Sequence, residues 1–125
     1  MCYLFNLNDL DGGKEYVRQK ISDYINDLVN IGVKGFRVDA SKHMWPDDLA
    51  AIQGRVQGNP FFFHEVIDMG GEAIKVQEYF GVGKVTEFRY GIKLAECIRG
   101  GDFNCLGGIY DQVSLTIQKV DPQKR

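Results

Sequence analysis

The sequence predicts an α/β fold in which short parallel strands alternate with helices. Short apolar runs at 35–38, 61–66 and 85–89 are typical of strands, and each is followed by a segment with helical character. The first two runs both deliver a carboxylate at their C-terminal ends. Repeated strand–helix alternation indicates right-handed crossovers between parallel strands, whose carboxyl ends are where α/β proteins place their chemistry.

The first predicted element is an amphipathic helix over residues 14–30. Residues 2–13, which precede it, are rich in asparagine, aspartate and glycine and indicate a loop. Apolar side chains recur in the helix at spacings of three and four, which places them on one face, and Gly32 is a stop signal. These apolar residues are Val17, Ile21, Tyr24, Ile25, Leu28 and Val29.

The strand that begins at Gly35 is expected to be buried, yet it carries Arg37 and Asp39. Because side chains alternate across a strand, these two residues point to the same face. A buried guanidinium needs an anion, and a buried carboxylate needs a cation or hydrogen-bond donors. The pair is therefore either a structural ion pair within a core or part of a functional site.

The remaining elements continue the alternation. Pro46 is suited to the first position of a helix that ends near Gly58, and the acids after it complement the helix dipole. Glu65 lies near the end of the second strand, after a run of phenylalanines. The predicted elements are a strand at 61–66, a short helix at 72–79, a strand at 85–89 and a helix at 92–99.

Two sequence blocks resemble a known family. G-F-R-V-D-A-S-K-H-M-W-P (35–46) and H-E-V-I-D-M-G-G-E (64–72) closely resemble animal-type α-amylases, which are retaining glycoside hydrolases built on a (β/α)8 TIM barrel. Shorter blocks at 14–20 and 85–91 extend the resemblance to roughly residues 2–100. A complete barrel needs about 250 residues. The resemblance therefore implies a fragment with about three consecutive barrel strands in residues 1–100, followed by a divergent or frayed tail at 101–125.

The resemblance assigns the catalytic roles to Asp39 as nucleophile and Glu65 as proton donor. Glycoside cleavage with retention requires these two carboxyl groups. The surroundings in the sequence agree, because a neighbouring arginine favours an ionised Asp39, whereas burial behind phenylalanines would favour a neutral Glu65. A zinc site formed by His43, His64 and Glu65 is conceivable, but no metal-ligand spacing supports it.

The resemblance also implies ligand sites. Lys42, the side chain of His43, and Glu72 match residues that line the sugar groove. Arg37 matches an arginine that binds chloride, an activator expected only in the complete enzyme. Asp9 and the backbone carbonyl of His43 match ligands of a structural calcium ion, a hard cation that prefers oxygen. The later family block that carries a further aspartate is not recognisable in this sequence.

Composition limits the other possibilities. The formal net charge of −2 gives no electrostatic reason to expect nucleic-acid binding, and no apolar run approaches the ~18 residues of a membrane span. The resemblance implies a secreted protein, monomeric at full length, whose signal peptide lies upstream of this fragment. Three cysteines cannot all pair with one another. Cys2 matches a family cysteine that is bridged to an upstream residue, whereas Cys97 and Cys105 could pair with each other.

The function expected from these features is endo-hydrolysis of α-1,4-glucosidic bonds in starch and glycogen. The isolated fragment of 125 residues is expected to be inactive and poorly folded, since open strand edges invite aggregation. One alternative is an amylase relative that acts on another α-glucan. A second is a non-catalytic amylase-like barrel that serves as a binding or scaffold module, although a scaffold has no chemical need for both Asp39 and Glu65. A third is an aberrant gene product without a stable fold.

Overall fold

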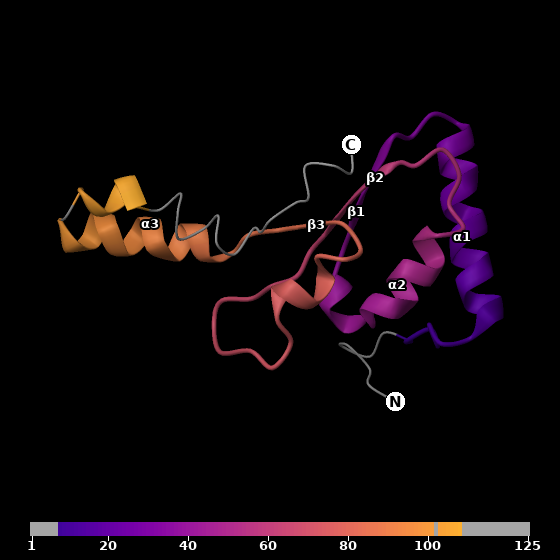
Figure 1. Cartoon of the computed structure of the whole chain (residues 1–125), viewed down its shortest axis with the longest axis horizontal. Coiled ribbons are helices and arrows are strands. Elements are labelled where there is room, and N and C mark those ends of the chain that lie inside the picture. Colours follow the sequence, from indigo (N-terminus) through magenta and orange to yellow (C-terminus); the bar gives the residue numbers. More distant parts are fainter. Residues whose placement is uncertain (1–7, 102, 109–125) are drawn as a thin grey trace.

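The computed structural model describes residues 8–101 and 103–108 (Figure 1). Helices and strands alternate along this part of the chain, as the sequence predicts. The elements are α1 (Glu15–Asn30), β1 (Gly35–Val38), the 3-10 helix η1 (Ser41–His43), α2 (Pro46–Gln53), β2 (Phe61–His64), the 3-10 helix η2 (Val76–Tyr79), β3 (Lys84–Val85) and α3 (Arg89–Gly100).

The three strands form one parallel sheet in the order β1-β2-β3. In its register Val38 is opposite His64, and His64 is opposite Val85. In Figure 1, α1 and α2 lie together on one side of the strands, and α3 extends away on the other side. The predicted α/β class and parallel crossovers are therefore confirmed for these three strands.

A buried serine joins α1 to α2. Ser22 has no exposed surface, and its hydroxyl lies 2.7 Å from the carbonyl oxygen of Arg18 and 3.0 Å from that of Ile52. Arg18 also donates through Nε to the carbonyl of Gly12 (2.7 Å) and pairs with the carboxylate of Asp48. These bonds fix the loop before α1 and the start of α2 to the same helix.

The hydrophobic core is small and lies beneath the carboxyl ends of the strands. It consists of Leu49, Val66, Val76 and Tyr79, against which Val38 and other partly buried residues pack. Tyr79 is only 2% exposed and donates its hydroxyl to the carbonyl oxygen of Met44 (2.9 Å). The core thus holds the segments that follow β1 and β2 close to each other.

The structure corrects several predicted bounds. Helix α2 ends at Gln53 rather than near Gly58, β2 ends at His64, and β3 has only two residues instead of extending over 85–89. The predicted helix at 72–79 is a 3-10 helix of four residues. Helix α3 begins at Arg89, three residues early, because the carboxylate of Glu87 accepts a hydrogen bond from the backbone N–H of Tyr90 (2.5 Å).

The prediction that β1 is buried is wrong for this chain. Gly35 and Arg37 are exposed, and Phe36 and Val38 are only half-buried. Within the described residues β1 has a neighbouring strand on one edge only, β2, so little covers its faces. Phe36 stacks on Phe62 of that strand, with ring centroids 5.4 Å apart. Tyr24, which the periodicity predicts on the apolar face of α1, is also exposed.

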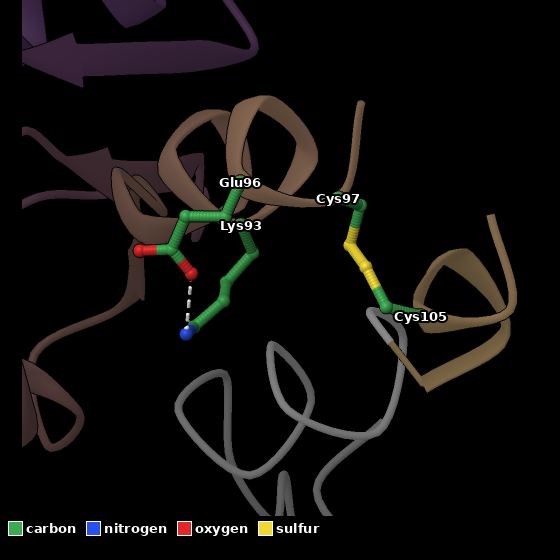
Figure 2. The surroundings of a disulfide bond; sticks show 4 residues. All are labelled: Lys93, Glu96, Cys97 and Cys105. Atoms are coloured by element: carbon green, nitrogen blue, oxygen red, sulfur yellow. Dashed lines mark hydrogen bonds and ion pairs between the residues drawn. A yellow bond between two sulfur atoms is a disulfide. The ribbon is translucent and has the colours of Figure 1, made fainter. Parts of the chain in front are cut away.

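A disulfide between Cys97 and Cys105 ties α3 to the turn that follows it (Figure 2). The Cα atoms are 5.7 Å apart, which is a usual spacing for a disulfide. Gly101 ends the helix with a φ of 66°, a left-handed conformation that glycine adopts readily. Residues 103–108 of the predicted tail are therefore attached to α3. Cys2 lies outside the described residues.

No helix in the described ranges is long and apolar enough to cross a membrane.

Candidate active site

The two predicted catalytic acids follow neighbouring strands. Asp39 comes directly after β1, and Glu65 comes directly after β2. The parallel ladder continues to this point, since the backbone N–H of Glu65 donates to the carbonyl of Val38 (2.9 Å). The pairing of Val38 with His64 therefore brings both carboxylates to the carboxyl end of the sheet, next to each other.

Arg37 bridges the two acids. Its Nη1 atom lies 2.5 Å from Oδ1 of Asp39, and its Nη2 atom lies 2.6 Å from Oε1 of Glu65. The hydrogen bond that Arg37 donates to Asp39 is the largest contribution that raises the pKa of Arg37, and Glu65 adds to it. The prediction that Arg37 and Asp39 share a face is confirmed. The side chains are not deeply buried, however, with 46% of Arg37 and 73% of Asp39 exposed.

A turn after β1 supplies a second donor to Glu65. Oε2 of Glu65 accepts a hydrogen bond from the backbone N–H of Ala40 (3.1 Å). Ala40 has a φ of 49°, in the left-handed region that costs a residue with a Cβ about 1–2 kcal/mol. Such strain is often found where a backbone group is held for function. The apolar surroundings expected for Glu65 are not found, because Arg37 and Ala40 contact its two oxygens.

His64 is a buried side chain with polar partners at both ring nitrogens. It has no exposed surface, and Nδ1 lies 2.9 Å from the hydroxyl of Ser41. Nε2 lies 2.9 Å from the amide of Gln53 and 3.2 Å from the carbonyl of Val82. Burial lowers the pKa of His64, and the contact with Val82 only partly opposes this shift. Both ring nitrogens are engaged, so the geometry does not support a zinc site at this histidine.

Two of the three predicted groove residues, Lys42 and Glu72, contact the loop after β2, whereas His43 does not share these contacts. The ammonium of Lys42 donates to the carbonyl of Ile67 (2.8 Å), and Oε1 of Glu72 accepts the backbone N–H of Met69 (3.0 Å). That N–H is the main cause that lowers the pKa of Glu72, and Lys42 contributes electrostatically. The structure thus brings Lys42 and Glu72 to the same loop. His43 lies at the end of η1 with an exposed side chain.

Asp68 is a site residue that the sequence reasoning did not single out. Its side chain is 2% exposed and forms an ion pair with Arg89 (Oδ1 to Nη2, 2.8 Å). The backbone N–H groups of Gly70 and Val76 donate to its two oxygens (3.0 and 3.2 Å). Burial raises the pKa of Asp68, but Arg89 and the two N–H groups outweigh it and hold the pKa well below the usual range. The two glycines that follow it in the sequence were the available signal of a sharp loop around an acid.

The predicted calcium ligands are the side chain of Asp9 and the backbone carbonyl of His43. Asp9 is exposed, and no group of three or more His, Cys, Asp or Glu side chains that could hold a metal occurs within residues 8–101 and 103–108. For the predicted chloride site, both Nη atoms of Arg37 already bind carboxylates. An anion would therefore have to bind elsewhere on the guanidinium or displace one of these acids.

Comparisons with known proteins agree with the geometry. No family model matches the sequence. Pancreatic α-amylase of Rattus norvegicus is 55% identical over 108 residues, which are 78% of this chain and 21% of that protein. The α-amylase of Phaedon cochleariae is 52% identical over 112 residues, or 81% of this chain and 23% of that protein. The chain is homologous to animal α-amylases.

The comparison of this chain with solved structures also finds α-amylases. α-Amylase I of Eisenia fetida superimposes with a TM-score of 0.75 and 46% sequence identity, over 81% of this chain and 22% of that protein. The three parallel strands and their helices therefore have the arrangement of a segment of an α-amylase TIM barrel. The chain spans about a fifth of the length of the relatives that it matches.

Proposed function

We propose that a protein containing this chain hydrolyses internal α-1,4-glucosidic bonds of starch and glycogen with retention of configuration. The observation that carries the proposal is the bridge of Arg37 between Asp39 and Glu65. It holds two carboxylates close together at adjacent strand ends, in a segment homologous to α-amylases. Retaining enzymes need their two carboxyl groups about 5–5.5 Å apart.

The chemistry divides between the two acids. A carboxylate oxygen of Asp39 attacks the anomeric carbon and forms a covalent ester while the bond to the glycosidic oxygen breaks. Glu65, in its protonated form, gives its proton to that oxygen as it leaves. Glu65 then takes a proton from water, which attacks the anomeric carbon and releases Asp39. Arg37 orients both groups.

The substrate is proposed to lie over the loops after β1 and β2. Lys42, His43 and Glu72 are the proposed sugar contacts, and they come from these two loops. The structure of a glutamate-to-glutamine mutant of Eisenia fetida α-amylase I contains maltohexaose, and the part of that protein that matches this chain is 45% identical in sequence. This relative supports an α-glucan as the substrate.

Further proposals depend on the family rather than on the geometry of the chain. Asp9 offers an exposed carboxylate, which is a suitable calcium ligand, and the carbonyl of His43 would be a second one. Calcium would supply a structural link between the early loop and the loop after β1. Chloride at Arg37, secretion and a monomeric full-length enzyme are proposed on the same basis. A binding or scaffold role is less favoured, because Asp39 and Glu65 are both present and are both held by Arg37.

The test uses the full-length enzyme that carries this chain; an equivalent protein is Eisenia fetida α-amylase I with its matching segment replaced by this sequence. Asp39→Asn and Glu65→Gln should each lower the turnover of soluble starch by a factor of about 10²–10⁴ without changing the circular dichroism spectrum. Asp47→Asn, an exposed acid in the first turn of α2, is the matched control. Near-normal turnover by either catalytic variant contradicts the proposal. Residues 1–125 alone are expected to have no activity.

A further inference from the structure

The last residue of β2 is a buried histidine, His64. It directly precedes Glu65, and because side chains alternate along the chain at a strand end, the imidazole points to the face opposite the Glu65 carboxylate. The imidazole is fully buried, and its two nitrogens face different parts of the fold. Nδ1 faces Ser41 of η1, whereas Nε2 faces Gln53 of α2 and the carbonyl of Val82.

The Nδ1 edge is connected to the catalytic turn. Ser41 has no exposed surface, and its hydroxyl also donates to the carbonyl of Val38, the last residue of β1 (3.0 Å). Ser41 directly follows Ala40, whose N–H donates to Glu65. His64 is therefore linked to Glu65 through a second route besides the chain itself. Its imidazole contacts Ser41, Ser41 fixes the strained turn at Ala40, and the N–H of Ala40 donates to Glu65.

Gly83 leaves room for the imidazole of His64, because it has no side chain. A Cβ placed on Gly83 would lie 3.1 Å from Cδ2 and 3.2 Å from Nε2 of His64, and 3.0 Å from the carbonyl oxygen of Phe62. Only glycine leaves room there without a shift of the strand or the ring. Burial also favours the neutral imidazole, which can both donate and accept a hydrogen bond.

We propose that His64 is a positioning residue for catalysis, which acts through its Nδ1 bond to Ser41 to hold the Asp39–Ala40 turn in place against Glu65. This inference deepens the proposed function and rests on it. The Nε2 edge, which faces Gln53 and Val82, serves the stability of the fold. The two edges of one ring therefore have separable roles, and they can be tested separately.

The experiment compares variants on the two edges in the full-length enzyme. Ser41→Ala removes the partner of Nδ1, and we expect kcat on soluble starch to fall about tenfold while KM changes less than about twofold, since small displacements of catalytic groups are costly to rate. Gln53→Ala removes a partner of Nε2, and we expect it to lower the melting temperature while kcat stays unchanged. His64→Gln, whose amide can donate and accept, should retain most of kcat.

A double-mutant cycle adds a second criterion. His64→Leu should lower kcat as Ser41→Ala does, and the double variant should be no slower than either single one, because both remove the same bond. Additive losses would overturn the inference, as would an unchanged kcat in Ser41→Ala or an equal loss of kcat in Gln53→Ala. If His64→Leu does not fold, the comparison of Ser41→Ala with Gln53→Ala decides the question alone.

The outcome is distinguishable from a failure of the proposed function. If Asp39→Asn and Glu65→Gln abolish hydrolysis but Ser41→Ala changes only the melting temperature, the inference about His64 is wrong and the catalytic assignment stands. If the Asp39 and Glu65 variants remain active, the proposed function itself is wrong.

Discussion

Nη2 of Arg37 lies 2.6 Å from Oε1 of Glu65, although 28 positions separate the two residues in the sequence. The same guanidinium binds Asp39, so one planar group sets the relative position of both acids. Arginine suits this role because its donors form a rigid fork, whereas the ammonium of lysine is a single flexible point charge. We therefore expect Arg37 to affect catalysis through both acids, which an isolated Arg37–Asp39 pair would not do.

Arg37→Lys should lower kcat on starch about 10- to 100-fold, because the positive charge remains but the fixed geometry of Asp39 and Glu65 is lost. Steady-state kinetics on the full-length enzyme measure this effect. Arg55→Lys is the control, since Arg55 pairs with the exposed Glu15 on the helical side of the fold. A loss of activity in Arg55→Lys that matches the loss in Arg37→Lys would show that the effect is not specific to the site.

Asp68→Asn should reduce the free energy of unfolding by about 1–3 kcal/mol at pH 7, because a buried charge-assisted pair with Arg89 is lost. The folded-state pKa of Asp68 is depressed, so its contribution is complete well above the ordinary value of 3.8 and is lost as the pH falls below that value. Unfolding measured against pH should therefore show parent and variant converging in acid.

The control for this measurement is Glu96→Gln, which breaks an exposed pair with Lys93 (2.7 Å, Figure 2). Exposed pairs contribute about 0–1 kcal/mol, so this variant should resemble the parent at every pH. A difference between Asp68→Asn and the parent that persists unchanged into acid would contradict the assignment of the buried charge.

The Cys97–Cys105 disulfide should protect α3 from local opening. The bond closes a loop of 8 positions, for which the chain-entropy treatment gives about 2–3 kcal/mol. Cys105→Ser should speed amide hydrogen exchange in residues 89–100 and leave β1 and β2 unaffected, because α3 lies apart from them (Figure 1). Reductant should reproduce this effect in the parent and add nothing in the variant. A bridge from Cys97 or Cys105 to another cysteine in non-reducing peptide mapping would refute the pairing.

If Asp9 ligates calcium, Asp9→Ala should lower the melting temperature of the full-length enzyme in calcium by several degrees and should abolish most of the difference between calcium and chelator. The reason is that a ligand bound only to the folded state stabilises it. Asp27→Ala removes another exposed carboxylate, on α1, and should retain the calcium response. Equal responses of both variants and the parent to chelator would exclude Asp9 from the site.

Local pattern was sufficient to predict α1, β1, β2 and the shared face of Arg37 and Asp39. Each of these depends on periodicity within a few residues, which the sequence displays directly. The bridge to Glu65 could not be predicted in this way, because it depends on the register that pairs Val38 with His64. Spacing along one strand carries no information about that register.

The buried roles of His64 and Asp68 were missed for a related reason. Their partners are Ser41, Gln53 and Arg89, which come from other elements, and long-range packing determines which polar groups lose contact with water. The third strand was predicted too long because V-T-E-F-R has strand propensity, whereas the Glu87 carboxylate starts helix α3 instead. Here a side chain to backbone hydrogen bond outweighs propensity.

The most direct test of the central claim is to identify the residue that carries the covalent intermediate. The experiment uses the Glu65→Gln variant of the full-length enzyme and α-maltosyl fluoride as the substrate. Fluoride leaves without protonation by an acid, so Asp39 can form an ester with the anomeric carbon as the C–F bond breaks. Without Glu65 to activate water, this ester should accumulate. Peptide mapping by mass spectrometry should then find one maltosyl group on Asp39. A maltosyl group on any other residue, or hydrolysis of the fluoride at the parent rate with no labelled peptide, would contradict the account.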